Sequence, residues 1–262
     1  DLVKESIIFN QKDIYYNKDK FDSGEINLCF ITGYSGSGKS TLAHSKEKDN
    51  IEVYELDDVI WNKERFTMEN FKEYGDLIYT FFKGSGSKYY MTFNKNGEKE
   101  EGKWDGENYE RDLITDFIKY AINWANSHKN KKYIIEGVWL FCADEKGKLF
   151  FEPSYFKDYA VYIKGTSALV STIRAAKRDK QNFRSSINGL KNRLLDAKNI
   201  NKFINYYKNK SVNESYIEER LNEKLDINSE IIEFNKELNS WDYGVLINGK
   251  VYTKSDKIDW SK

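Results

Sequence analysis

The chain has 262 residues, of which 39% are hydrophobic, and this length suits one α/β domain with insertions. Its 42 basic and 42 acidic side chains cancel, so no overall charge draws it to nucleic acid or to an anionic membrane surface. No apolar run approaches the roughly 18 residues that span a bilayer, and Cys29 and Cys142 lack metal-ligand spacing, so we expect a cytoplasmic protein with free thiols and no membrane partner.

The first recognisable motif is a phosphate-binding loop. Residues 1–22 are expected to form an N-terminal extension or short helix before a domain of residues 23–254. An apolar run at residues 26–32 predicts a strand, and residues 33–41 then read Gly-Tyr-Ser-Gly-Ser-Gly-Lys-Ser-Thr. This segment fits the pattern G-x-x-x-x-G-K-[ST] at every fixed position. A Gly/Ser linker is the alternative, but the strand before it and the helix expected at residues 39–48 favour the loop.

The residue types of this loop suit the binding of a nucleoside triphosphate. Its glycines allow successive backbone N–H groups to converge on a phosphate. Lys39 can reach the β- and γ-phosphates, and Ser40 can offer its hydroxyl to Mg²⁺. We therefore predict that ATP and Mg²⁺ bind here, and the residues expected to hold the nucleotide are Gly33, Ser35, Gly36, Ser37, Gly38, Lys39, Ser40 and Thr41.

The next elements alternate between strand and helix. A strand is predicted at residues 51–56, and it ends at the two acids Asp57 and Asp58. A helix is expected over residues 67–82. In residues 84–106, alternating residues flank an Asn/Gly turn and glycines mark both ends, which predicts a β-hairpin insertion. The aromatic side chains of this insertion would either face an acceptor or pack on the core.

The second half of the chain continues this alternation. A helix is expected over residues 109–127, and buried strands at residues 132–137 and 159–163. Residues 166–240 are expected to form a helical lid and C-terminal appendage, and a last strand spans residues 242–248. Strands separated by helices imply an α/β fold with a parallel sheet of about five strands and helices on both of its faces.

Three polar segments fall at the carboxyl ends of predicted strands, where ligands of parallel sheets gather. They are the phosphate loop, the Asp57–Asp58 pair and Glu136 with Gly137. Asp57 could accept the proton of an acceptor hydroxyl or orient that hydroxyl, and Asp58 is the second candidate. A helix N-cap, or a group that contacts Mg²⁺ through water, is the alternative for Asp57. Glu136 could hold Mg²⁺ through water, bind acceptor hydroxyls or act as a cap.

Taken together, these motifs resemble the P-loop small-molecule kinases, most closely the uridine kinase and phosphoribulokinase group. The resemblance covers about residues 26–184 and rests on four segments: the phosphate loop, Leu56-Asp57-Asp58, Ile134-Ile135-Glu136-Gly137, and Arg174-Ala175-Ala176-Lys177-Arg178-Asp179 with Arg184 after it. It implies that Arg174, Arg178 and Arg184 form a lid that clamps the phosphates, whereas a solvated helix face is the alternative for each arginine. The residues that read the acceptor in uridine kinases have no recognisable counterpart, so the resemblance implies the donor and the reaction only.

Three functions follow from this set. The first is an ATP-dependent phosphotransferase that moves the γ-phosphate to a hydroxyl of a small acceptor, such as a nucleoside, nucleotide or sugar. The second is a kinase of a polynucleotide or a conjugated sugar, of the polynucleotide kinase or zeta-toxin type. The basic stretch at residues 191–210 would favour this second function, but a solvated helix explains it equally well, so nucleic acid is the less favoured partner. The third is a non-catalytic nucleotide-binding switch, which would need neither Asp57 nor the arginines.

Overall fold

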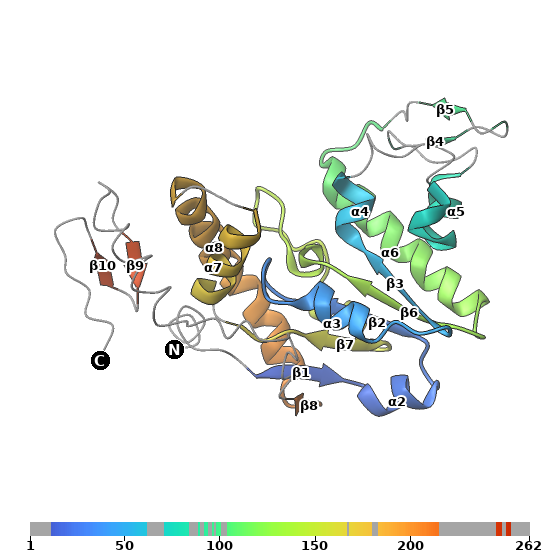
Figure 1. The fold of residues 1–262 in the computed structure, drawn as a ribbon, viewed down its shortest axis with the longest axis horizontal. Coiled ribbons are helices and arrows are strands. Elements are labelled where there is room, and N and C mark those ends of the chain that lie inside the picture. Colours follow the sequence, from blue (N-terminus) through green and yellow to red (C-terminus); the bar gives the residue numbers. More distant parts are fainter. Residues whose placement is uncertain are drawn as a thin grey trace.

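The computed structural model describes residues 12–61, 71–83, 89, 92–93, 96, 98–100, 104–166, 168–179, 183–214, 245–247 and 250–252. Within these residues the chain forms an α/β fold in which helices cover both faces of a central sheet (Figure 1). The strands of the sheet are β1 (Asp13–Tyr16), β2 (Leu28–Thr32), β3 (Ile51–Glu55), β6 (Lys132–Glu136), β7 (Ala160–Ile163) and β8 (Ser211–Glu214). The α-helices are α2 (Lys18–Ser23), α3 (Lys39–Ser45), α4 (Leu56–Trp61), α5 (Asp76–Phe82), α6 (Tyr109–Ser127), α7 (Ala168–Asp179) and α8 (Phe183–Tyr207).

The central sheet is mixed, which corrects the expectation of a purely parallel sheet of about five strands. Its six described strands lie in the order β3-β6-β2-β7-β1-β8. The first four are parallel to one another, whereas β1 runs antiparallel to both β7 and β8. The parallel part therefore consists of the strands predicted from the sequence, and the antiparallel edge comes from segments that were expected to be an extension and a helix.

The strand β1 was not predicted because its pairing depends on groups distant in the sequence. Its first residue, Asp13, is only 4% exposed, which is unusual for a carboxylate at a strand end. Three groups from the end of β7 satisfy it: the hydroxyl of Tyr162 at 2.7 Å, the ammonium of Lys164 at 3.2 Å and the backbone N–H of Gly165 at 2.8 Å. The four residues of β1 begin with an acidic side chain, and these distant contacts cannot be predicted from those residues alone.

The two faces of the sheet pack in two separate clusters, because successive side chains of a strand point to opposite faces. In β2, Leu28 and Phe30 belong to the larger cluster, and Cys29 and Ile31 to the smaller one. Helices α4, α5, α6 and α8 cover the larger cluster, whereas α2 and α3 cover the smaller one. The strand that leads into the phosphate loop is thus buried on both sides.

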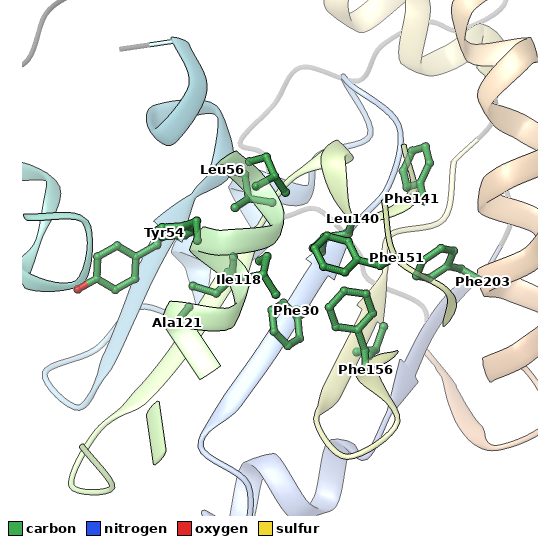
Figure 2. Close-up of a cluster of buried hydrophobic side chains, with 14 of the residues drawn as sticks. Phe30, Tyr54, Leu56, Ile118, Ala121, Leu140, Phe141, Phe151, Phe156 and Phe203 are labelled. Carbon is green, nitrogen blue, oxygen red and sulfur yellow. The ribbon is translucent and has the colours of Figure 1, made fainter. Parts of the chain in front are cut away.

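Aromatic rings fill much of the larger cluster. Figure 2 shows Phe30 of β2 together with Phe156 and Phe203, and the rings of Phe30 and Phe156 lie 4.7 Å apart. Phe156 belongs to the 3₁₀ turn η3 (Pro153–Phe156), and Phe203 belongs to α8. Phe156 also packs against Phe203 at a centroid distance of 6.3 Å, so α8 belongs to the same core as the centre of the sheet.

Several predicted helices have the expected bounds, and others end early. The helix α6 spans the predicted residues, and the side chain of Asn108 caps it by accepting the N–H of Arg111 at 2.9 Å. The helix expected over residues 67–82 is interrupted: η1 (Phe71–Tyr74) ends at Gly75, whose φ is 89°, and α5 then begins. The helix α8 ends at Tyr207, and β8 follows it where the helical pattern was expected to continue.

The insertion contains a short hairpin, as predicted, in which β4 (Thr92–Phe93) pairs antiparallel with β5 (Lys99–Glu100). The predicted last strand is represented by β9 (Val245–Ile247), which pairs with β10 (Lys250–Tyr252) and not with the central sheet. Residues 1–11 of the expected extension, most of residues 84–103 of the insertion and residues 215–240 of the appendage lie outside the described residues. No helix among the described residues is long and apolar enough to cross a membrane.

Candidate functional site

The predicted phosphate loop connects the end of β2 to the start of α3. Gly36 and Gly38 have φ values of 84° and 91°, a left-handed conformation that glycine adopts without strain. A Cβ atom on Gly36 would lie 2.3 Å from the carbonyl oxygen of Ser171 on α7, so there is no room for a side chain at this position. The N–H of Ser37 donates to the carbonyl of Tyr34 at 3.0 Å, which closes a tight turn. The loop is therefore compact and in contact with α7.

Lys39, Ser40 and Glu136 come together at the end of this loop. The hydroxyl of Ser40 donates to one carboxylate oxygen of Glu136 at 2.7 Å, and the ammonium of Lys39 lies 3.7 Å from the other. Glu136 is 1% exposed and Lys39 is 6% exposed. Burial raises the pKa of Glu136, and the nearby Lys39 ammonium offsets part of that rise. The two segments that the sequence placed at neighbouring strand ends are thus in direct contact.

Backbone contacts fix the end of β6 beside the loop. The hydroxyl of Thr32 donates to the carbonyl of Gly137 at 2.9 Å, and the N–H of Gly137 donates to the carbonyl of Ile31 at 3.0 Å. A Cβ atom on Gly137 would lie 2.8 Å from the side chain of Leu56 at the start of α4. The missing side chain allows the turn between β3 and α4, which carries Asp57, to approach the end of β6.

Asp57 and Asp58 occupy the first turn of α4, directly after β3. The indole N–H of Trp139 donates to a carboxylate oxygen of Asp57 at 2.9 Å. Trp139 belongs to the 3₁₀ turn η2 (Val138–Phe141), and its ring lies nearly parallel to that of Phe150, at 13° and a centroid distance of 6.4 Å. Sequence reasoning missed Trp139, although its place three residues after Glu136 put it beside a predicted strand end.

The arginines predicted to form a lid have different environments. On α7, Arg178 is exposed and Arg174 is half-buried. The same helix contacts the predicted loop at Gly36 through Ser171 and Ala175. The side chain of Arg184, on the first turn of α8, lies outside the described part of the structure. Their proposed contacts with phosphates remain predictions.

A different arginine contacts the loop directly. Arg193 of α8 is 8% exposed, and its Nε and Nη2 atoms donate to the carbonyl oxygen of Ser35 at 3.1 and 2.8 Å. Arg193 belongs to the predicted basic stretch of residues 191–210, but the spacing of buried positions marks it as a buried residue. Leu190 and Ala197 of α8 are also buried, and Arg193 falls between them on the same helix face.

Two aromatic residues of the insertion pack on α6. Tyr89 is buried, and its hydroxyl donates to Asp116 at 2.6 Å. The indole of Trp104 donates to Asp112 at 3.2 Å and packs edge-on against Tyr109. For these two side chains the structure favours the packing alternative over a contact with an acceptor.

Among the described residues, no group of three histidine, cysteine, aspartate or glutamate side chains could hold a metal ion. Magnesium, however, is commonly bound through one or two carboxylates with water and substrate phosphates. Glu136 has one buried carboxylate oxygen without a hydrogen-bond partner in the described part of the chain, and Ser40 supplies a hydroxyl next to it. These two oxygen donors fit the ion.

The chain was also compared with known proteins. A scan against protein-family models finds no match, and a search of curated proteins finds no significant relative.

Proposed function

We propose that this protein is an ATP-dependent phosphotransferase that moves the γ-phosphate to a hydroxyl of a small acceptor. The observation that carries the proposal is the contact of Lys39 and Ser40 with Glu136 at the end of a glycine-rich loop. Asp57 follows the neighbouring strand β3 and is tied to the turn after Glu136 by Trp139. A buried cation, a hydroxyl and a carboxylate therefore lie together at the end of the loop, and a second carboxylate is joined to the turn that follows Glu136.

The donor side of this reaction is assigned to the loop. Its backbone N–H groups would bind the phosphates, and Lys39 would neutralise negative charge on the β- and γ-phosphates. Ser40 and Glu136 are the residues that would hold Mg²⁺. Held there, Mg²⁺ would supply positive charge that offsets the negative charge of the phosphates. Because Glu136 already binds both loop residues, it also keeps Lys39 and Ser40 in fixed positions before a ligand arrives.

The acceptor side is assigned to Asp57. Its carboxylate would accept the proton of the acceptor hydroxyl, or orient that hydroxyl for attack. The hydrogen bond from Trp139 to one carboxylate oxygen fixes the rotamer of Asp57 and leaves the second oxygen to face another partner. A non-catalytic nucleotide switch needs no such carboxylate, so this pair favours an enzyme.

The resemblance to P-loop small-molecule kinases supports the same reaction. In a polynucleotide kinase, the basic stretch of residues 191–210 would have to face a nucleic acid. Arg193 does not face solvent, since it is buried against the phosphate loop. Lys198 and Lys202 are exposed, which a solvated helix face explains equally well. We therefore favour a small acceptor.

The test is a transfer assay with γ-labelled ATP and pools of small hydroxylated acceptors, in which the acceptor that takes up label identifies the substrate. Replacing Asp57 by Asn should lower kcat about 10²- to 10⁴-fold and leave ATP affinity nearly unchanged, because the base acts on the acceptor and not on the nucleotide. The matched variant Asp58→Asn should lower kcat far less.

Lys39→Ala is the positive control of this assay. It should lower turnover at least about 100-fold, the size typical of losing a charge partner of the transition state. Full activity of folded Lys39→Ala would remove the phosphate-loop assignment. A larger loss in Asp58→Asn than in Asp57→Asn would move the base to Asp58.

A further inference from the structure

Two helices hold the phosphate loop on successive residues. Arg193 of α8 donates two hydrogen bonds to the carbonyl oxygen of Ser35. The next residue, Gly36, lies so close to α7 that a Cβ atom would meet the carbonyl oxygen of Ser171 at 2.3 Å. The peptide between Ser35 and Gly36 is therefore held by both elements of the helical segment that follows β7.

This arrangement fixes the direction of one backbone donor. In a trans peptide the C=O and N–H bonds point in opposite directions, and the described backbone contains no cis peptide. A guanidinium bound to the Ser35 oxygen from the side of α8 therefore directs the N–H of Gly36 away from α8. A phosphate loop needs its N–H groups to converge on the ligand, and its carbonyl groups to point outward.

We propose that Arg193 is a positioning residue that holds the Ser35 carbonyl outward, so that the N–H of Gly36 is oriented to bind a phosphate of the nucleotide. This inference rests on the proposed function, because it assumes that the loop binds a nucleoside triphosphate. Arg193 touches the loop backbone and acts through it. Arg193 also couples α8 to phosphate binding at the loop. It binds the C=O group of the Ser35–Gly36 peptide, and a bound phosphate would accept a hydrogen bond from the N–H group of the same peptide.

Burial and charge agree with this role. Arg193 is 8% exposed, so its hydrogen bonds to Ser35 are shielded from water and are stronger than those of a surface arginine. Asp196 follows one turn later on α8, and burial raises its pKa to about 6 while the nearby Arg193 lowers it. A buried guanidinium adds positive charge beside a loop that would bind an anion. A lysine could supply the charge, but only arginine offers several donors in a planar fork.

The experiment measures the binding of ATP and of pyrophosphate by calorimetry to the full chain and to four variants. Arg193→Ala should weaken both ligands about 10- to 100-fold, the loss expected for a charge-assisted hydrogen bond. Arg193→Lys should lose less, and it serves as the variant that keeps the charge if Arg193→Ala does not fold. Lys198→Ala is the matched control on the exposed side of α8, and it should bind as the wild type does. Lys39→Ala tests whether the ligands bind at the loop.

Two further readouts separate positioning from a purely structural anchor. Free guanidinium at millimolar concentration should restore pyrophosphate affinity to Arg193→Ala but not to Lys39→Ala. In the wild type, the amide resonance of Gly36 should shift on addition of pyrophosphate, and this shift should shrink in Arg193→Lys.

The outcomes are distinguishable. If the wild type binds neither ligand, the proposed function fails and the inference fails with it. If Lys39→Ala loses binding and folded Arg193→Ala retains it, the proposed function stands and the role of Arg193 is overturned. A third outcome is that Arg193→Ala binds weakly, guanidinium does not restore its affinity, and pyrophosphate shifts the Gly36 resonance equally in Arg193→Lys and in the wild type. Arg193 would then only anchor α8, and the inference would be overturned.

Discussion

At the scale of single residues, the candidate base depends on a neighbour from another strand end. Asp57 reaches its position on α4 because β3 ends beside β6, but the orientation of its carboxylate depends on Trp139 in η2. An indole N–H is a fixed donor, and it constrains a carboxylate more than water would. Proton transfer is sensitive to such orientation, because the base must lie within hydrogen-bond distance of its proton.

Trp139→Phe tests this dependence. The variant keeps the ring and removes the N–H, so kcat should fall about 5- to 50-fold, as expected for the loss of a hydrogen bond to a charged group. The KM for ATP should stay nearly constant, since the loop is untouched. The control is Trp124→Phe on α6, which lies at the end of that helix near His128 and should leave kcat unchanged. Equal kcat values in all three proteins would remove the positioning role of Trp139.

Asp196 gives a prediction for the dependence of stability on pH. Burial raises its pKa to about 6, so the folded state holds a proton that the unfolded chain releases near pH 4. The folded state therefore loses stability through this group as the pH rises from about 4 to 6. Asp196→Asn removes this loss. Its free energy of unfolding should exceed that of the wild type by about 1 to 2 kcal/mol above pH 7, after allowance for partial exposure and the lost attraction of Arg193.

Urea denaturation at pH 4, 5, 6 and 7 measures the difference between the two proteins. It should be smallest at pH 4, where the aspartate is protonated in the fold, and it should stop growing above about pH 7. Asp158→Asn, at an exposed position, is the control and should follow the wild type at every pH. A constant difference across the series would mean that Asp196 titrates normally.

At the scale of elements, the loop and α7 are fitted to each other at Gly36. Gly36→Ala would place a methyl group against the backbone of α7 and would also strain a left-handed residue. We expect a loss of about 3 kcal/mol or more in the free energy of unfolding. Gly147→Ala separates the two causes, because Gly147 has a φ of 76° but nothing within 4 Å of the added Cβ. The free energy of unfolding of Gly147→Ala should fall by about 1 kcal/mol. Similar losses in Gly36→Ala and Gly147→Ala would contradict the close approach of α7.

Elements with strong local patterns were predictable from the sequence, and elements defined by distant partners were not. The helix α6 has regular buried positions and an asparagine cap, and the prediction of its bounds is confirmed. The strand β6 has an apolar centre, Tyr133-Ile134-Ile135, that is buried, as expected of a strand covered on both faces. The strand β1 was missed because Tyr162, Lys164 and Gly165 complete it from 149 to 152 residues away. The end of α8 at Tyr207 was missed because the polar segment after it carries no strong helix stop.

The same division applies to the candidate site. The contact between the loop and Glu136 could be predicted, because the loop follows one recognisable strand, Glu136 ends another, and parallel strands bring their carboxyl ends together. Trp139 and Arg193 could not be assigned, since their partners Asp57 and Ser35 lie 82 and 158 positions away. The periodicity of α8 marks Arg193 as buried, but it does not say what Arg193 contacts.

At the scale of the whole molecule, the antiparallel edge of the sheet depends on one buried ion pair. Asp13 and Lys164 are 4% and 7% exposed, and they join β1 to the end of β7. Asp13→Ala would leave a buried ammonium without its carboxylate, so the free energy of unfolding should fall by about 3 kcal/mol or more. Asp22→Ala removes a surface ion pair with Lys18 and should change the free energy of unfolding by less than about 1 kcal/mol.

Chemical denaturation of both variants measures these changes. Equal losses would contradict the buried character of the pair. A loss confined to Asp13→Ala would show that the N-terminal strand belongs to the cooperative unit of the domain.

The double burial of β2 has a consequence for how the domain opens. Amide protons of β2 should exchange with solvent only when the whole domain unfolds, because both faces and both edges of that strand are covered. The helix α3 has seven residues and packs on the smaller cluster alone, so its amides should exchange through local opening. The predicted phosphate loop should therefore join a slowly exchanging segment of the chain to a faster one. A ligand at the loop would slow exchange mainly on the α3 side, and the free energy of local opening there would report its occupancy.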